Sequence, residues 1–354
     1  MIDLEAEYSR AKTIACIIPF FNGSATVERA IKSVVHQTRL PDEFIIVNDG
    51  SEREERGRLC TLQLKYNFTI IDQSNAGQGA ARNIGVLNSK SDLICFLDQD
   101  DYFLPNHVYE LFNALPVNDK TFGYIFSDYS VGTFEGNILQ RCCLAGNVPL
   151  QCHNNIKSLL RNSMSIVPSC AMISKLAFEA IGGFDTQFRG YEDDDLFLRF
   201  FYNGYSDYYL NKNLLVWCIH TNSASFSITM SRSGYLYFNK LADSFKDDPV
   251  IGNYYLRDCL LPRFIPVFIN ELAEAKKNHS PHYDELLAKI IECRKRVEAN
   301  DYISRGTKNR LALEIAFLSS FPFVFFDVYT KSAKFFRRIK FLLRRIVLHD
   351  ESGI

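Results

Sequence analysis

A dense cluster of carboxylates occupies the run Asp98-Gln99-Asp100-Asp101. Three carboxylates within four residues repel one another, so an ordered site here needs a compensating cation. A divalent metal ion bound to a phosphate-bearing substrate would supply that charge. The alternative is a solvated acidic turn, which is a common feature, but this cluster directly follows the apolar run 93–97. The run therefore favours a metal and phosphate site.

A second acidic cluster, Glu192, Asp193, Asp194 and Asp195, begins an amphipathic segment. The helix dipole stabilises acids in a first turn, which explains some of them without any function. Helix capping does not require four. A carboxylate that faces the first cluster could act as a general base and remove the proton of an attacking hydroxyl. We expect the Gly-Gly-Phe-Asp turn at 182–185 to bring this helix back to the same cleft.

His220 ends a further apolar run, 217–220, and precedes a small polar loop. A single histidine is usually a structural residue. In a chain whose acidic cluster predicts a metal ion, a histidine just after a strand is also a candidate ligand beside the carboxylates.

The elements that must position these residues alternate regularly over the first hundred positions. Apolar runs at 13–18, 44–47, 68–71 and 93–97 predict strands, and the segments between them have helical spacing. Strands that are continuously apolar indicate a parallel sheet covered on both faces. With right-handed crossovers, the prediction is a doubly wound, mostly parallel α/β sheet.

Polar residues follow the carboxyl end of each of these predicted strands. They are Asn22, Asp49, the glycine-rich loop 77–79 and the run 98–101. Ligands of open α/β sheets bind at that edge, so we expect the four groups to converge on one site.

The composition describes a globular chain. Of 354 residues, 47% are hydrophobic and 23% charged, with 40 Lys and Arg against 41 Asp and Glu. This excludes disorder and a polytopic membrane protein, and the near-zero net charge argues against a general nucleic-acid binder. The ten cysteines form no C-x-x-C pair, and Cys16 and Cys95 lie in apolar runs, which indicates buried thiols in a reducing compartment. The polar N-terminus and the lack of a long apolar segment predict a cytoplasmic protein.

The pattern changes near residue 230, which predicts two domains, 1–230 and a mainly helical 231–354. Residues 331–348 contain seven Lys or Arg and no acid. Phe335, Ile339 and Leu342 share one helical face, with arginines on the other. This pattern is typical of a helix that lies on an anionic membrane surface. The alternative is an ordinary surface helix packed on the rest of the protein.

Taken together, the motifs resemble those of family 2 inverting glycosyltransferases of the GT-A fold. The matching pieces occur in the family's order over about residues 12–225, and six in order are a strong signal. They are Ile17-Ile18-Pro19-Phe20-Phe21-Asn22, Ile46-Val47-Asn48-Asp49-Gly50-Ser51, the loop and helix start at 77–85, Phe96-Leu97-Asp98-Gln99-Asp100-Asp101, Gly182-Gly183-Phe184-Asp185 with Glu192-Asp193, and His220.

The resemblance implies a nucleotide-sugar site. Phe21 would stack on the base, Asp49 would accept a hydrogen bond from the uracil of a UDP-sugar, Arg82 would lie near the base or phosphates, and Asp98 would face the ribose. The residue before Asp49 is often Asp in the family and is Asn48 here. The implied donor-binding residues are Pro19, Phe21, Asn22, Asp49, Arg82, Asp98 and Gln99.

The resemblance also implies the catalytic groups. Asp193 would be the general base, and Glu192 would help to hold the acceptor or the helix start. Asp100 and His220 would bind Mn²⁺ or Mg²⁺ at the diphosphate, with Asp101 behind them. Inversion needs no covalent intermediate, and no cysteine lies in a recognisable nucleophile motif.

The implied function is transfer of a sugar from a nucleoside-diphosphate sugar to a hydroxyl of a glycan or lipid-linked acceptor. The family association points to bacterial surface polysaccharide such as lipopolysaccharide, with the protein on the inner face of the cytoplasmic membrane. One alternative is a non-catalytic nucleotide-sugar-binding or scaffolding protein of the same fold. Another is a nucleotidyltransferase, but its basic, glycine-rich loop after the first strand is missing, since residues 19–25 contain no Lys or Arg.

Overall fold

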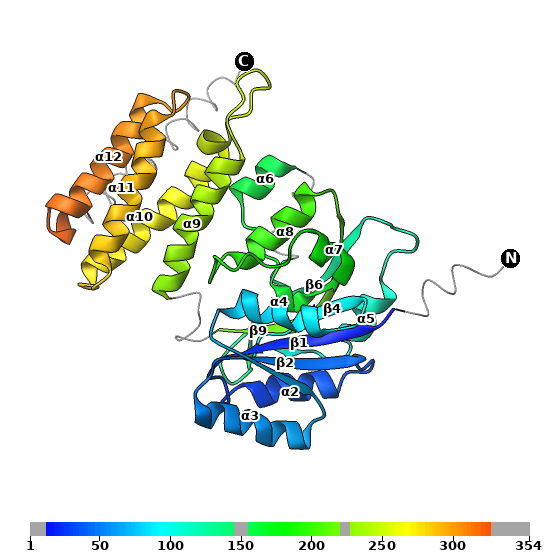
Figure 1. The fold of residues 1–354 in the computed structure, drawn as a ribbon. Coiled ribbons are helices and arrows are strands. Elements are labelled where there is room, and N and C mark those ends of the chain that lie inside the picture. The colour runs from blue at the N-terminus through cyan, green and yellow to red at the C-terminus, as the bar shows by residue number, and fades with distance from the viewer. Residues whose placement is uncertain (1–11, 145–154, 220–226, 327–354) are drawn as a thin grey trace, which may run out of the picture. The chain divides into compact units, whose positions relative to one another are not determined.

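The computed structural model describes residues 12–144, 155–219 and 227–326 (Figure 1). The chain divides into two compact units, residues 1–237 and 238–354. The division falls inside helix α9 (Ile228–Ser244), and the predicted boundary at residue 230 lies in the first turn of the same helix. His220 and the basic segment 331–348 lie outside the described residues.

The first unit is built around a mixed sheet with the strand order β3-β2-β1-β4-β8-β6-β9-β5, and β7 pairs with β6. The strands are β1 (Ile14–Phe20), β2 (Glu43–Asp49), β3 (Thr69–Gln73), β4 (Leu93–Phe96), β5 (Tyr102–Phe103), β6 (Phe122–Gly132), β7 (Ile138–Gln140), β8 (Ala171–Ser174) and β9 (Ser206–Cys218).

The pairings of β1 with β2, β1 with β4 and β2 with β3 are parallel, as the alternating pattern predicts. Beyond β4 the sheet is more mixed, because β8 pairs antiparallel with both β4 and β6, whereas β6 and β9 are parallel. The predicted α/β fold class is confirmed. More than seventy residues separate β4 (Leu93–Phe96) from β8 (Ala171–Ser174), and the local hydrophobic periodicity does not predict the direction in which β8 enters the sheet.

Helices cover both faces of the parallel half of the sheet. Figure 1 shows α2 (Val27–Val35) and α3 (Arg53–Lys65) on one face and α4 (Gln78–Asn88) on the other. The strand order reverses between β1 and β4, so the loops after these strands diverge and leave a crevice at their carboxyl ends. The other helices of this unit are α5 (His107–Asn113), α6 (Ile156–Arg161), the 3₁₀ turn Pro168–Cys170, α7 (Lys175–Ala180) and α8 (Glu192–Tyr202).

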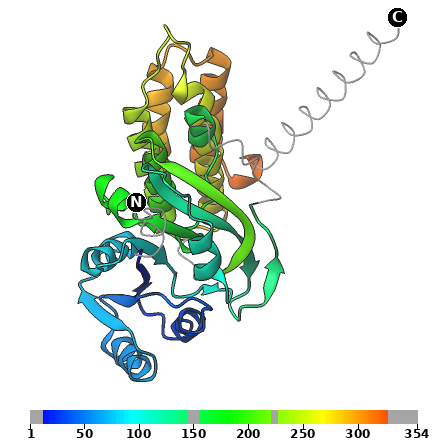
Figure 2. The ribbon, with the colours of Figure 1, turned by 90° about the vertical axis from the view of Figure 1, so that its right-hand side faces the viewer.

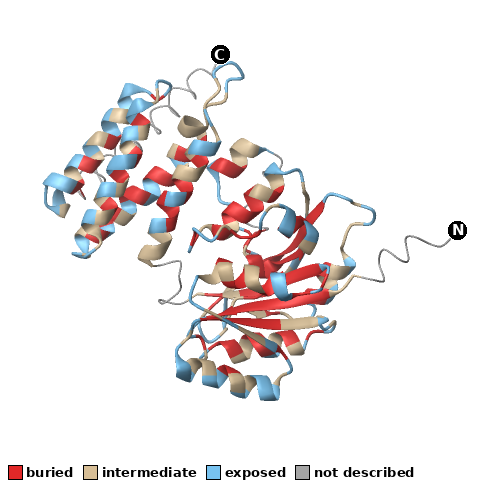
Figure 3. Ribbon diagram, viewed as in Figure 1, coloured by how far each residue is buried: buried red, intermediate tan, exposed pale blue. Residues whose placement is uncertain are grey.

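The core explains why β1 is apolar throughout: every one of its residues is buried between the two helical layers (Figure 3). On the α4 side the layers approach closely, since a Cβ added to Gly85 would lie 2.4 Å from Cγ2 of Ile17. Only glycine permits this separation, which brings the second half of α4 against the middle of β1.

The second unit is helical. It comprises the end of α9, a π-helical turn Leu256–Leu260, α10 (Leu261–Lys277), α11 (Tyr283–Ala299) and α12 (Arg305–Ser320). Figure 2 shows the long helices again from a turned viewpoint. Phe238 packs against Phe264 and Phe268, with ring centroids 5.7 and 6.0 Å apart. Among the described helices, none combines the length and apolarity that a membrane span requires.

Candidate functional site

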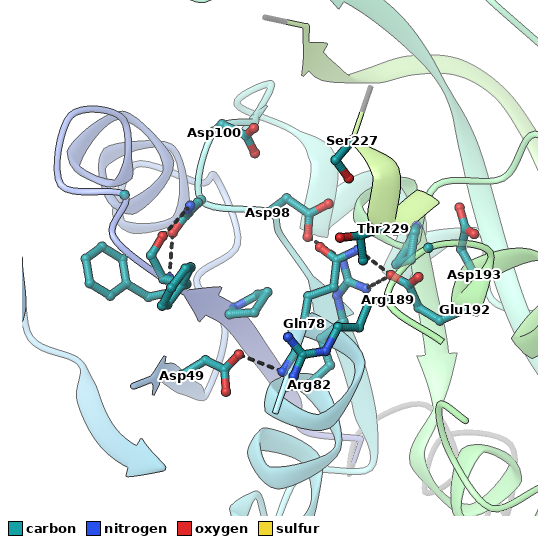
Figure 4. A pocket seen from close by; sticks show the side chains of 18 of the residues that line it. Asp49, Gln78, Arg82, Asp98, Asp100, Arg189, Glu192, Asp193, Ser227 and Thr229 are labelled. Carbon is teal, nitrogen blue, oxygen red and sulfur yellow. Dashed lines mark hydrogen bonds and ion pairs between the residues drawn. The ribbon is translucent and has the colours of Figure 1, made fainter. Parts of the chain in front are cut away.

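A cavity of about 690 Å³ lies at the carboxyl ends of the strands of the first unit (Figure 4). A volume of this order suits a ligand the size of a nucleotide sugar. Its wall includes ten of the eleven predicted site residues, namely Pro19, Phe21, Asn22, Asp49, Arg82, Asp98, Gln99, Asp100, Glu192 and Asp193. The eleventh, His220, lies outside the described residues, and its metal-binding role stays a prediction.

The loop after β1 is fastened to the acidic run that follows β4. Gln99 makes two hydrogen bonds to the backbone of Phe21: its Oε1 accepts from the N–H at 2.9 Å, and its Nε2 donates to the carbonyl at 3.1 Å. The Phe21 ring is 46% exposed and lines the cavity. The ring is therefore available to stack on a planar group.

Asn22 adopts a left-handed backbone conformation with φ of 46°. Its Oδ1 accepts from the N–H of Glu52, and its own N–H donates to Oγ of Ser51. These bonds join the loop after β1 to the loop after β2.

Asp49, at the end of β2, is almost fully buried and holds the next loop in place. Its carboxylate accepts hydrogen bonds from the N–H groups of Ala76 and Gly77 and from Nε2 of Gln73, at 2.7 to 2.8 Å. Asn48 is likewise engaged in the protein, because its Nδ2 donates to Asp72. Asp49 thus sets the shape of the glycine-rich loop as well as facing the cavity, a supporting function that the motif alone does not reveal.

Arg82, on α4, links the two acidic clusters. It is 1% exposed, and its guanidinium donates to Oδ1 of Asp98 and, at 3.2 Å, to Oε1 of Glu192 (Figure 4). Burial by itself would lower the pKa of the guanidinium, but the two carboxylates raise it, so the side chain stays charged. Both terminal nitrogens of the guanidinium, Nη1 and Nη2, therefore donate to carboxylates of the protein. A position of Arg82 near the base or the phosphates of a donor stays a prediction.

The second acidic cluster starts helix α8, as predicted. Tyr191 precedes the helix in a left-handed conformation with φ of 64°, and Glu192 is its first residue. Glu192 is buried and also accepts from Nε2 of Gln78. The Asn83 side chain exchanges two hydrogen bonds with the backbone of Phe184, at 2.8 and 2.9 Å, and so holds the predicted glycine turn against α4.

Asp193 follows directly and lines the cavity. Burial raises the pKa of its carboxyl from 3.8 to about 7, helped by the negative charges of Glu192 and Asp194. A carboxylate with a pKa near 7 is a better proton acceptor than an ordinary aspartate and is still ionised in part at neutral pH. Asp194 has a structural task, because its carboxylate accepts from the N–H of Met164 and the hydroxyl of Tyr237.

The first acidic cluster divides in two. Asp101 is buried and accepts a hydrogen bond from the N–H of Cys218, which ties the loop to β9, while its other oxygen has no hydrogen-bond partner among the described residues. Burial first, and then Asp100 and Asp98, raise the pKa of Asp101 well above 3.8. Asp100 lines the cavity instead, half-buried.

The charge of the cavity wall favours a bound cation. Among the described residues, the cavity is lined by two arginines, Arg82 and Arg189. The carboxylates outnumber them and are Asp49, Asp98, Asp100, Glu192 and Asp193. No three His, Cys, Asp or Glu side chains among the described residues are grouped so as to hold a metal by themselves. Mg²⁺ commonly takes one or two carboxylates and completes its shell with water and substrate phosphates. Asp100 fits that arrangement.

Several lining residues were missed by the sequence reasoning, among them Gln78, Arg189, Trp217 and Thr229. Gln78 lies within the glycine-rich loop 77–79, which the sequence had already placed at the site. Trp217 begins the apolar run 217–220, in which only His220 was predicted to belong to the site. Arg189 and Thr229 lie outside the motifs, and only the packing of the loop before α8 and of the start of α9 brings them to the cavity.

Comparisons with known families agree with this geometry. The sequence model described as glycosyl transferase family 2 matches residues 15–182, and one described as the N-terminal domain of galactosyltransferase matches residues 157–215.

Three bacterial relatives are uncharacterized glycosyltransferases. The one from Rickettsia prowazekii is 30% identical over 194 residues, which cover 53% of this chain and 58% of the relative. Those from Haemophilus influenzae and Bacillus subtilis are each 28% identical, covering 60% and 52% of this chain and 71% and 67% of the relatives. The match thus spans little more than half the length of the Rickettsia protein.

Two solved structures share the fold. S. aureus TarS 1–349, in complex with UDP-GlcNAc, gives a TM-score of 0.58 at 12% identity and covers 91% of both chains. A mannosyltransferase from Pyrobaculum calidifontis, in complex with GDP-Man and Mn²⁺, gives 0.53 at 14% identity and covers 86% of both chains. At these identities the likeness shows the GT-A fold.

Replacing Arg82 by Met should destabilise the first unit. The variant leaves the buried Glu192 carboxylate and the neighbouring Asp98 without their cation, and breaking a buried ion pair costs about 3 kcal/mol or more. Urea unfolding of the two proteins measures the difference. Arg58→Met, which removes a guanidinium from an exposed pair on α3, is the control and should change the free energy of unfolding by less than about 1 kcal/mol. Equal stability of the Arg82 variant and wild type would contradict the bridging role.

Proposed function

We propose that this chain, whose residues 15–182 match the model described as glycosyl transferase family 2, transfers a sugar from a UDP-sugar to a hydroxyl of a glycan or lipid-linked acceptor, with inversion at the anomeric carbon. The observation that carries the proposal is the contact of Arg82 with Asp98 and Glu192. It joins the predicted donor side and the predicted acceptor side at one cavity.

The donor would lie along the loops after β1, β2 and β4. The Phe21 ring would stack on the base, and Asp49 holds the loop beside it. The complex of TarS with UDP-GlcNAc supports a UDP-sugar in a cavity of this fold, although the mannosyltransferase neighbour was solved with GDP-Man. Of the two nucleotides, we propose UDP, because the resemblance of the motif at 46–51 implies uracil recognition by Asp49.

In the proposed reaction the acceptor oxygen attacks the anomeric carbon from the face opposite the phosphate. The new carbon–oxygen bond forms as the bond to the diphosphate breaks, and UDP leaves with that electron pair. The hydroxyl proton passes to the carboxylate of Asp193. The raised pKa of Asp193 supports this assignment, since it strengthens the base while the neighbouring Glu192 is engaged by Arg82 and Gln78.

A divalent metal would be held by Asp100, with the predicted help of His220, and by phosphate oxygens of the donor. The excess of carboxylates over arginines on the cavity wall supports this choice. When bound, Mn²⁺ or Mg²⁺ would neutralise charge on the departing diphosphate.

The experiment that tests the function is release of UDP from a panel of UDP-sugars, with Mn²⁺ and with EDTA. We expect turnover only with metal, and Asp100→Ala should lose both turnover and metal-dependent UDP binding. Glu179→Ala is the control, because this exposed carboxylate lies on α7, whose start contacts the opposite edge of the sheet through the bond from Lys175 to Asp92. Absence of metal-dependent turnover with every sugar would favour a non-catalytic binding protein.

Asp193→Asn should leave the dissociation constant for UDP unchanged and lower kcat by about 10²- to 10⁴-fold, the usual contribution of a general base. In the wild type, Asp193 is protonated below its pKa of about 7 and cannot accept a proton. The rate should therefore fall about tenfold per pH unit below about 7 and level off above it, and the variant should lack this limb. Parallel loss of UDP binding, or a product with retained anomeric configuration, would contradict the assignment.

For the acceptor, we propose a lipid-linked intermediate of bacterial surface polysaccharide, reached at the inner face of the cytoplasmic membrane. The support is the sequence of residues 331–348, with its seven basic residues and no acid. A chain ending at residue 330 should lose binding to vesicles that contain phosphatidylglycerol, because each basic residue near an anionic surface contributes about 1 kcal/mol. Vesicles of phosphatidylcholine alone are the control. Undiminished sedimentation with the anionic vesicles would remove the membrane proposal.

A further inference from the structure

The two arginines of the cavity differ in what surrounds their charge. Arg82 is buried and engaged by Asp98 and Glu192. Arg189 is exposed, and within the described residues its guanidinium forms no ion pair with a carboxylate. Carboxylates of the protein therefore neutralise Arg82, whereas the guanidinium of Arg189 is exposed at the cavity.

The backbone of Arg189 is nevertheless held firmly. Its N–H donates at 3.0 Å to Oγ of Ser233, a buried residue of α9. The next residue, Gly190, lies so close to α9 that an added Cβ would come within 2.7 Å of Sδ of Met230. The backbone that carries the side chain is thus fixed between α8 and the first turns of α9, while the guanidinium forms no ion pair with the described part of the chain.

The Arg189 side chain extends over the glycine-rich loop. A Cβ added to Gly77 would lie 3.3 Å from Cγ and 3.4 Å from Nε of Arg189. The N–H groups of Ala76 and Gly77 are turned toward Asp49, which accepts both. The loop therefore offers little positive charge of its own at these two positions, and Arg189 is the cation beside it.

We infer that Arg189 binds the diphosphate of the nucleotide sugar. A guanidinium presents paired N–H donors that match two phosphate oxygens, and its charge would offset part of the carboxylate excess of the wall. Its place between the loop held by Asp49 and the start of α8 lies along the path from the base side of the cavity to Asp193. The inference rests on the proposed function, because it needs a diphosphate-bearing ligand in this cavity.

The test compares UDP with uridine, which lacks phosphate, in the presence of Mg²⁺. Trp217 is the only tryptophan of the chain and lines the cavity, so its fluorescence reports binding directly. The proteins are the full-length wild type, Arg189→Ala, Arg189→Lys and Lys90→Ala. Lys90 is exposed and precedes β4, at the edge of the sheet opposite the cavity, and its loss removes the same charge.

We expect Arg189→Ala to weaken UDP binding by about ten- to a hundredfold, as for loss of charge-assisted hydrogen bonds, and to leave uridine binding unchanged. Arg189→Lys should fall between, because it keeps the charge but loses the paired donors. Lys90→Ala should match the wild type for both ligands.

Unchanged UDP affinity in Arg189→Ala would overturn the inference, and so would equal weakening for UDP and uridine, which would indicate a general change in cavity shape. If the wild type binds neither UDP nor uridine, the proposed function fails and the inference fails with it. Thermal unfolding of each variant establishes that the protein tested is folded.

Discussion

The site depends on one interaction, the buried ion pairs of Arg82 with Asp98 and Glu192. Asp98 follows β4 and Glu192 begins α8, so each belongs to a different acidic cluster. Without a cation between them, their repulsion and the cost of burying charge would favour separating the two segments. Arg82 makes it possible for both clusters to face one cavity. Gly85, one turn further along α4, allows the helix to lie close to β1 and so places Arg82 within reach of both carboxylates.

The same interaction separates the tasks of neighbouring residues. Glu192 and Asp193 both line the cavity, but Glu192 is engaged by Arg82, and Asp194 accepts a hydrogen bond from Met164. The charges on either side and the loss of water raise the pKa of Asp193 to about 7. A helix start with several acids thus provides both the attachment of the helix and a carboxylate suited to proton transfer. Asp98 and Asp100 both line the cavity, and Asp98 in addition contacts Arg82.

The supporting residues of the donor side show how loops can form a firm site. Gln99 joins the loops after β1 and β4, Asn22 joins the loops after β1 and β2, and Asp49 holds the loop before α4. Each bond links segments far apart in sequence, and each uses a residue of a motif. The motif residues therefore shape the cavity in addition to any contact with a ligand.

The sequence by itself determined the alternation of strands and helices along the first hundred residues and the placement of polar residues at strand ends. Both follow from local hydrophobic periodicity and turn chemistry. The sequence also predicted ten residues that the structure brings to one cavity. Only the tertiary structure decided that β8 enters antiparallel, that Arg82 is buried between two acids and that Arg189 reaches the cavity. These features depend on contacts between residues as much as 110 positions apart and on the exclusion of water, neither of which a local pattern records.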